Sequence, residues 1–406
     1  MTTLTPNDPA SAIAEIRLGA LRHNLDVLRD RAAGLDIMAV VKADAYGHGA
    51  ARVSRFLADE GVTSFAVATL EEALALRASG LEHRILVFAA PVPEQLDHYA
   101  RHDLEVTVTS PEVADAVIDT ARRVGKLRVH VKVDTGMGRI GLAPGRTVDV
   151  IRRLERAASV EIAGIWTHFA TSDEPGDPWV HEQWRRFREV VTQLGSFPAP
   201  LHAANSGGLL CNPVAIDPGV VTTVRLGIAL YGLYGSLGPL PDPLGPGPGP
   251  GRGPVPEPEP GLGLLTVMRF VTRLTHVKTV AAGTPISYGL SWRAPRETRI
   301  GTISVGYADG YGRRLSNRGE VGIGGSRCAV AGRVCMDMTM IDLGLAGEGP
   351  AARVGDEVVL FGDGGPSPFE VARWAETITY EIVCGISARV ARRYVDPTRS
   401  PSVEGL

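Results

Sequence analysis

The sequence predicts an α/β protein: an N-terminal (β/α)8 barrel followed by a smaller, mainly antiparallel β domain. Up to about residue 232, eight short apolar runs alternate with helix-like segments. The runs are almost continuously apolar, which is typical of parallel strands covered on both faces. After residue 263 the pattern becomes β-rich with glycine turns. Eight repeats and the length favour a closed barrel, and an open doubly wound sheet is the alternative.

The expected barrel strands follow one another at regular intervals. They are residues 37–42, 65–69, 85–89, 104–110, 128–134, 160–169, 201–205 and 222–227. The segment 69–80 carries helix signals, because Thr69 is followed three residues later by Glu72 and the segment ends at Gly80. Residues 179–195 repeat apolar side chains at helical spacing and also end on glycine.

A tract rich in proline and glycine, residues 235–263, divides the chain. It lacks the apolar content needed for packing, and we expect a surface linker or insertion. The predicted domains are therefore the barrel at 1–234 and the β domain at 264–406, with the first residues of the chain pairing with the β domain. Only one clear helix is expected after the tract, at 366–376.

Composition narrows the class of partner. The chain has 406 residues, is 44% hydrophobic and carries a formal net charge of −3. This charge predicts neither a nucleic acid nor an anionic membrane as partner, and a small molecule is expected instead.

Four cysteines without a C-x-x-C pair predict neither a disulfide scaffold nor a zinc site. The N-terminus does not resemble a signal peptide, and no run reaches the ~20 apolar residues of a membrane span. A cytoplasmic protein is expected.

Polar residues gather where the predicted strands end. Because the carboxyl ends of barrel strands face the active site, these residues are site candidates: Lys42, Tyr46, His48, Lys132, Asp134, Arg139, His168, Asn205, Ser206 and Arg225. Taken singly, each has a simpler explanation, such as a surface lysine, a core histidine or a turn. Their clustering at one end of the barrel favours a site.

The residue types at this end indicate a cofactor. A lysine in a partly dry site is a nucleophilic amine that forms Schiff bases. Ser206, followed by two glycines, offers a hydroxyl and backbone N–H groups to an anion. Barrels often hold phosphate after strands seven and eight. The combination suggests pyridoxal 5'-phosphate. A G-x-G-x-x-G match at 136–141 suggests a dinucleotide site less well, because proline and glycine follow where a helix should begin.

Several blocks of the sequence resemble the alanine racemase family, the fold-type III pyridoxal-phosphate enzymes. "AVVKADAYGHGA" resembles the family's cofactor-lysine signature. "KVDTGMGRIG", "THFAT", "HAANSGG", "RLGIALYG", "ISYG", "SVGYADGYGR", "VCMDM" and "YEIVCGIS" resemble its other blocks in the same order. The resemblance extends from about Ala14 to Tyr394 and is interrupted only by the Pro/Gly tract.

The resemblance implies a role for each matching residue. Lys42 would bind the cofactor covalently and act as one catalytic base, and Tyr288 would act as the second. His168 would pack on the pyridine ring and Arg225 would face its nitrogen. Asn205 lies in the block that binds the cofactor. The residues implied to contact the cofactor phosphate are Tyr46, Ser206, Gly227, Ile228 and Tyr380. Those implied near the substrate are Arg139, Tyr307 and Met336, and Lys132 matches a lysine that many relatives carbamylate.

The family implies racemisation of alanine, in a homodimer whose active sites are shared between subunits. The product would be D-alanine for cell-wall precursors. Racemisation of serine or of several amino acids is the nearest alternative. A decarboxylase needs an acidic partner for the ring nitrogen, which Arg225 is not. A non-catalytic pyridoxal-phosphate-binding protein would have no use for Tyr288.

Overall fold

The computed structural model describes residues 10–234 and 262–396, and they form two compact units. One unit contains residues 24–45 and 49–230, and the other contains the remaining described residues, including 46–48. The Pro/Gly tract lies almost wholly outside the described residues, so the domain boundaries at 234 and 263 stay predictions.

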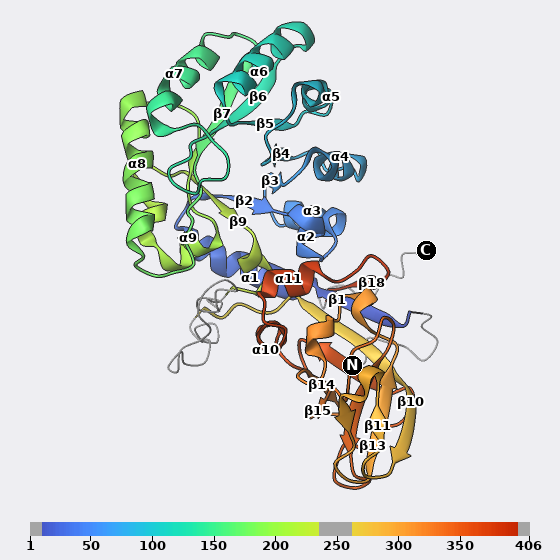
Figure 1. Cartoon of the computed structure of the whole chain (residues 1–406). Helices are drawn as coiled ribbons and strands as arrows, with labels where there is room; N and C mark the ends of the chain where they lie inside the picture. Colours follow the sequence, from blue (N-terminus) through green and yellow to red (C-terminus); the bar gives the residue numbers. More distant parts are fainter. Residues whose placement is uncertain (1–9, 235–261, 397–406) are drawn as a thin grey trace. The chain divides into compact units, whose positions relative to one another are not determined.

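The first unit is a closed barrel of parallel strands (Figure 1). Its strands are β2 (Asp36–Val40), β3 (Ser64–Val67), β4 (Arg84–Val87), β5 (Glu105–Val108), β6 (Leu127–Lys132), β7 (Val160–Trp166), β8 (Leu201–His202) and β9 (Thr223–Leu226). β9 pairs with β2 in parallel, with Asp36 beside Thr223, and this pairing closes the barrel. The predicted barrel is confirmed and the open sheet is excluded.

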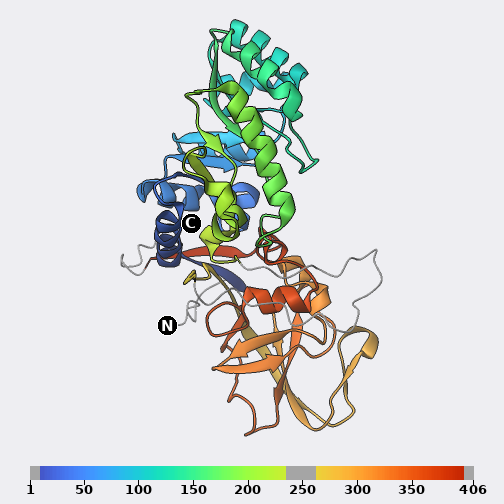
Figure 2. The same ribbon diagram turned by 90° about the vertical axis from the view of Figure 1, so that its left-hand side faces the viewer.

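Helices cover the outside of these strands. They are α1 (Leu18–Ala32), α3 (Ala50–Asp59), α4 (Leu70–Ala78), α5 (Leu96–Arg101), α6 (Pro111–Val124), α7 (Pro144–Glu155), α8 (Pro178–Leu194) and α9 (Ser206–Cys211), with the 3-10 turns η1 (Pro93–Gln95), η2 (Pro213–Ile216) and η3 (Ile228–Tyr231). Figure 2 shows α8, in yellow-green, running along the outside of the barrel. Helix α4 begins with the predicted capping box, in which Thr69 and Glu72 each bond the other's backbone.

The second unit is built on a mainly antiparallel sheet. Its main path is β15-β14-β17-β10-β1-β18, and β13 joins β10 to β16. The strands are β1 (Ala12–Arg17), β10 (Met268–Val280), β13 (Thr298–Ile303), β14 (Glu320–Ile323), β15 (Ser326–Ala329), β16 (Thr339–Gly344), β17 (Glu357–Phe361) and β18 (Ala391–Val395), and β11 (Pro285–Ile286) pairs separately with β12 (Trp292–Arg293). The first strand of the chain, β1, pairs with β10 and with β18 in this sheet.

Short helical segments complete the second unit. They are α10 (Pro368–Trp374), α11 (Thr379–Cys384), η4 (Tyr288–Leu290), η5 (Tyr307–Asp309) and η6 (Arg313–Leu315). Helix α10 matches the expected one, whereas α11 was not expected, because its N-cap residue Ile378 makes no side-chain cap. In the described ranges, no helix combines the length and apolar character needed to cross a membrane.

Candidate active site

Lys42 is the last residue before a left-handed turn at the end of β2. The backbone φ angles of Ala43, Asp44 and Ala45 are 51°, 54° and 54°, in the region that L-residues other than glycine rarely occupy. Each such residue costs about 1–2 kcal/mol, so the surrounding structure must impose the turn. A strained turn of this kind is typical of functional sites.

Hydrogen bonds from both sides hold this turn. Ala45 N donates to Val41 O at 2.9 Å, which closes the turn. The Asp44 carboxylate accepts from the N–H of Ala50 at the start of α3. Glu72, in the capping box of α4, accepts from Ala43 N at 2.6 Å. Helices α3 and α4 therefore both fix the segment that follows Lys42.

Arg225, on β9, is buried in the barrel at 2% exposure. Its Nη1 donates to the carbonyl oxygen and to Nδ1 of His202, and its Nη2 donates to the carbonyl oxygens of Thr167 and Ala203. Among the described residues no acceptor meets its Nε–H, which is therefore the donor left for an added group. Burial lowers the pKa of Arg225 to about 9, so it remains charged at neutral pH.

His168 follows β7 and lies beside Arg225. Its Nδ1 is 3.4 Å from Arg225 Nη2, and because a guanidinium only donates, this nitrogen is an acceptor. Burial, and then the positive charge of Arg225, lower the pKa of His168 well below its usual range. His168 is therefore a neutral imidazole at neutral pH.

Lys132, on β6, is also buried, at 1% exposure. Its Nζ donates to Val133 O at 3.0 Å and lies 4.9 Å from the centroid of the Trp166 ring. Burial, followed by the charge of Arg225, lowers the pKa of Lys132 to about 7. A neutral amine is the form of lysine that can take up carbon dioxide, so the state of Lys132 fits the carbamate that the resemblance implies.

Positive charge dominates this end of the barrel. Besides Arg225 and Lys132, the charges of Arg139 and Lys42 also lower the pKa of His168. Arg139 is exposed on the loop after β6. The cluster suits a ligand that carries negative charge, such as a phosphate or a carboxylate.

A backbone cradle lies after β8 and β9. Asn205 caps α9 by accepting from Gly208 N at 2.9 Å. The hydroxyl oxygen of Ser206 accepts from the N–H groups of Gly227 and Ala229 at 3.2 and 3.3 Å, so its own hydrogen is available to an anion. Ile228, with 1% exposure, follows Gly227 as the first residue of η3.

The first turn of α9 adds further donors to this cradle. The first N–H groups of a helix have no partner inside it. A Cβ at Gly207 would lie 2.8 Å from the backbone oxygen of Ser172, so glycine is required there. The arrangement fits a phosphate group.

The G-x-G-x-x-G loop at 136–141 does not offer such donors. Asp134 Oδ1 accepts from the N–H groups of Gly136, Met137 and Gly138 at 3.0 to 3.1 Å. The loop therefore binds its own carboxylate through the groups that would bind phosphate in a dinucleotide site, and helix α7 begins only at Pro144.

Two further candidates meet in the second unit. The ring centroids of Tyr46 and Tyr380 are 6.1 Å apart, and those of Tyr46 and Tyr231 are 5.2 Å apart. Tyr46 is 6% exposed. Arg392 Nε donates to Gly47 O and Tyr394 Oη donates to His48 O, so the segment after Tyr46 is anchored on β18.

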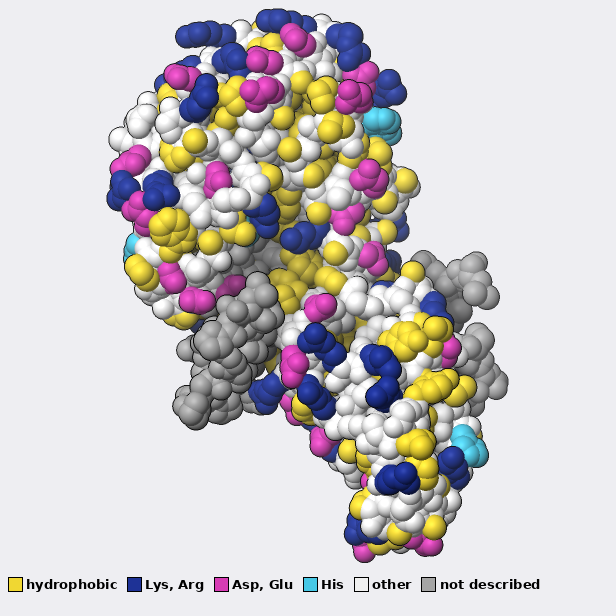
Figure 3. Space-filling view, viewed as in Figure 1, with side chains coloured by type: hydrophobic (Ala, Val, Ile, Leu, Met, Phe, Trp, Pro, Cys, Tyr) yellow, Lys and Arg dark blue, Asp and Glu magenta, His cyan; other side chains and the backbone are white. Residues whose placement is uncertain are grey.

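Tyr288, Tyr307 and Met336 are exposed in the same unit, at 72%, 42% and 53%. Their loops are tied together: Ser287 Oγ donates to Arg333 O at 2.6 Å, and Tyr307 N donates to Cys335 O at 3.0 Å. Hydrophobic side chains and basic side chains lie next to one another on the face of this unit seen in Figure 3. Exposed aromatic and methionine side chains on fixed loops are typical of an interaction surface.

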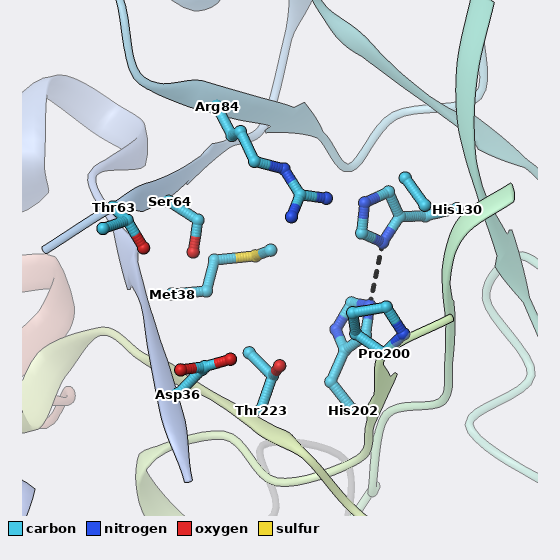
Figure 4. Close-up of a pocket in the computed structure, with 10 residues that line it drawn as sticks. Asp36, Met38, Thr63, Ser64, Arg84, His130, Pro200, His202 and Thr223 are labelled. Atoms are coloured by element: carbon cyan, nitrogen blue, oxygen red, sulfur yellow. Dashed lines mark hydrogen bonds between the residues drawn. The ribbon is translucent and has the colours of Figure 1, made fainter. Parts of the chain in front are cut away.

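Sequence reasoning missed the polar residues inside the barrel. Glu105 begins β5, His130 lies within β6 and His202 ends β8, with exposures of 0%, 1% and 0%. The available signal was a charged or imidazole side chain within a run that is otherwise apolar. His130 and His202 line a small cavity of about 50 Å³, together with Arg84 and Thr223 (Figure 4).

The fold and the cationic barrel mouth define an α/β-barrel protein with a site for an anionic small molecule. The family models for the N-terminal and C-terminal domains of alanine racemase match residues 16–235 and 267–394. The chain therefore belongs to the alanine racemase family, as its resemblance predicts.

Individual members of the family are similar to this chain over almost its whole length. The alanine racemase of Chlorobaculum tepidum is 41% identical over 95% of this chain and 96% of its own length. That of Symbiobacterium thermophilum is 42% identical over 94% and 96%. The crystal structure of alanine racemase from Streptomyces lavendulae has a TM-score of 0.84 and 36% identity, covering 96% of this chain and 98% of that one. The Bacillus anthracis enzyme "with bound L-Ala-P" has a TM-score of 0.81 and 33% identity, with 97% of each chain covered.

Proposed function

We propose that this protein interconverts L-alanine and D-alanine with pyridoxal 5'-phosphate as cofactor, and so supplies D-alanine for cell-wall precursors. The observation that carries the proposal is the full-length match to alanine racemases at about two-fifths identity. The cationic mouth of the barrel supports the binding of two anionic groups, the cofactor phosphate and the substrate carboxylate.

The described residues fit this cofactor. Ser206, Gly227 and Ile228, together with Tyr46 and Tyr380, are proposed to hold its phosphate. Lys42 is proposed to bind it covalently. His168, as a neutral imidazole, would pack on its ring, and Arg225 would offer Nε–H to the ring nitrogen. Because arginine does not readily give up a proton, that nitrogen would stay unprotonated, which argues against a decarboxylase.

When bound, pyridoxal phosphate withdraws electrons from the substrate Cα and so makes the Cα hydrogen acidic. Inversion needs one base on each side of Cα. We assign these roles to Lys42 Nζ and Tyr288 Oη: one removes the proton from its own side of Cα, and the other, in its protonated form, delivers a proton to the opposite side. Arg139, Tyr307 and Met336 are proposed to bind the substrate, and a carbamate on Lys132 would orient Arg139.

The exposure of Tyr288, Tyr307 and Met336 supports a homodimer in which these residues complete the partner's site. The dimer, its shared sites and the cytoplasmic location remain predictions. The small-molecule substrate follows from the family, and alanine is favoured over serine because the relatives above are named alanine racemases.

The test is incubation of the purified, cofactor-loaded protein with L-alanine in deuterated water. Loss of optical rotation together with deuterium at Cα is the expected result. Faster turnover of L-serine would assign a serine racemase instead. Release of carbon dioxide from L-lysine would indicate a decarboxylase. If the protein binds the cofactor but converts none of these amino acids, it is a non-catalytic binding protein.

A further inference from the structure

A line of three buried hydrogen bonds leads away from Arg225 through the barrel interior. His202 Nδ1 lies 3.1 Å from Arg225 Nη1, and His202 Nε2 lies 2.9 Å from His130 Nδ1. His130 Nε2 then lies 2.7 Å from Glu105 Oε2. Figure 4 shows the two imidazoles and the hydrogen bond that joins them.

The groups at the two ends of this line of hydrogen bonds fix which atom donates and which accepts in each bond. The Arg225 guanidinium can only donate, so His202 Nδ1 accepts. Burial, and then the charge of Arg225, lower the pKa of His202 well below its usual range, so its single proton resides on Nε2. His202 therefore donates to His130 Nδ1, and His130 donates from Nε2 to the Glu105 carboxylate, which only accepts.

We propose that Glu105 and His130 are positioning residues for Arg225: they fix the tautomer of His202, and His202 in turn holds the guanidinium whose Nε–H is left for the cofactor ring. The inference rests on the proposed function, because it assigns a role at the same site. It concerns groups that contact neither substrate nor cofactor in the proposed arrangement.

The charges at the two ends explain why such a chain is needed. Within the described residues no carboxylate pairs directly with Arg225, although its side chain is buried. Glu105 is the anion at the far end. Burial raises the pKa of Glu105, but its hydrogen bonds with His130 and Arg84, together with the charge of Arg84, outweigh burial and bring the pKa to about 2. An ionised carboxylate thus orders the two imidazoles toward a buried cation.

A glycine on the neighbouring strand makes room for the chain. On β7, a Cβ at Gly164 would lie 2.4 Å from His130 Nδ1 and 3.0 Å from His202 Nε2, the two atoms of the central hydrogen bond. The backbone φ of Gly164 is not in the left-handed region, so its conformation does not require glycine. Glycine is required because any side chain at this position would collide with the two histidine rings.

The competing explanation is that Glu105 only braces the end of the barrel where its strands begin. Its other oxygen accepts from Arg84 Nε at 2.6 Å, and Arg128 Nε lies 3.4 Å away. If Glu105 only stabilised this end of the barrel, its bond to Arg84 would matter as much as its bond to His130. Replacing Arg84, whose side chain is 44% exposed, therefore separates the two explanations.

The experiment compares Glu105→Gln with Arg84→Gln in the cofactor-loaded protein. Glutamine keeps the size of the side chain but can turn either its oxygen or its NH2 group toward His130, so it no longer fixes the tautomers. The first readout is the ¹⁵N spectrum of protein labelled at histidine, with the His202 resonances assigned by their loss in His202→Asn. The second is the separate measurement of kcat and KM for L-alanine.

We expect Glu105→Gln to convert His202 from one tautomer to a mixture and to lower kcat about tenfold, with KM changed less than about twofold. Arg84→Gln should leave the tautomer unchanged and kcat within about twofold of the parent. Unchanged His202 resonances in Glu105→Gln, or the same changes in Arg84→Gln, would overturn the proposal. If Glu105→Gln does not fold, Gly164→Ala, which keeps all four side chains but crowds the central bond, is judged by the same two readouts.

Failure of this inference is distinct from failure of the proposed function. If the parent protein does not racemise alanine, the proposed function fails, while the His202 spectrum still reports on the chain. If the parent is an active racemase and Glu105→Gln behaves like it, only the positioning role fails.

Discussion

At the scale of single residues, the buried amine of Lys132 makes the free energy of unfolding depend on pH. Its pKa in the folded protein is about 7, against ~10.4 for an unperturbed lysine. Between these values the unfolded chain binds a proton that the folded chain lacks, so stability rises with pH across this window. Below about pH 7 both states are protonated and the full cost of burying the charge is present.

Lys132→Met should therefore change the pH dependence of stability. The variant has no amine to protonate, so the unfolding free energy of the parent minus that of the variant should increase by about 1.4 kcal/mol or more from pH 7 to pH 9. Urea unfolding at each pH measures this difference. Carbon dioxide must be removed from the buffers, because a carbamate would hold Lys132 uncharged as an amine. A difference that stays constant with pH would contradict the low pKa.

Tyr288 is the opposite case, a candidate catalytic residue that contributes little to the fold. Since it is 72% exposed, Tyr288→Phe should change the unfolding free energy by no more than about 0.5 kcal/mol. Racemisation should fall by roughly 10² to 10⁴. Single-turnover exchange of the Cα hydrogen in deuterated water should be lost from one enantiomer of alanine and kept for the other. Equal loss from both enantiomers would show that Tyr288 is not the base of one face.

At the scale of elements, helix α4 does more than cover the barrel. Its capping residue Glu72 accepts from Ala68 N and Thr69 N at 2.7 and 3.3 Å with one oxygen and from Ala43 N with the other. The N-cap of α4 and the left-handed turn after Lys42 thus share one carboxylate. Glu72 therefore both caps helix α4 and stabilises the turn that follows Lys42.

Two substitutions separate these roles of the α4 cap. Thr69→Ala removes only the cap and should cost about 1 kcal/mol of stability with cofactor affinity nearly unchanged. Glu72→Ala also leaves Ala43 N without its acceptor, so it should cost about 1–3 kcal/mol and weaken cofactor binding several-fold. Thermal unfolding and titration with pyridoxal phosphate measure the two effects. Equal cofactor affinities in the two variants would rule out support of the turn by Glu72.

The elements also show what sequence patterns can reach. All eight barrel strands were predicted, because continuous apolar runs mark buried parallel strands. Most predicted ends lay too far along the chain; β7, for example, ends at Trp166 and not at residue 169, since polar residues at the barrel mouth follow without a break in pattern. The left-handed turn could not be predicted, because "ADAY" contains no glycine and its conformation is held by hydrogen bonds to residues outside it, from Ala43 N to Glu72 and from Ala50 N to Asp44.

At the scale of the whole molecule, the resemblance supplied what periodicity could not. Strand ends placed Lys42, His168 and Arg225 at one mouth, but no spacing rule connects them with Tyr288, which follows Lys42 by about 250 residues. The chain Glu105–His130–His202 was also out of reach. Its members lie on β5, β6 and β8, one to three strands apart in the sequence, and their side chains meet only in the folded barrel interior.

The arrangement of the catalytic pair in the assembled protein can be decided by mixing two inactive variants. If each site combines Lys42 of one subunit with Tyr288 of its partner, a hybrid dimer of Lys42→Ala and Tyr288→Phe has one doubly altered site and one unaltered site. With random exchange at equal amounts, half of the dimers are hybrids, so activity should recover to about a quarter of the parent's. Two affinity tags allow the hybrid to be isolated, and its activity should be about half. A site formed within one subunit leaves every species with one damaged residue per site, so a hybrid as inactive as its parents would place Tyr288 beside Lys42 of the same chain.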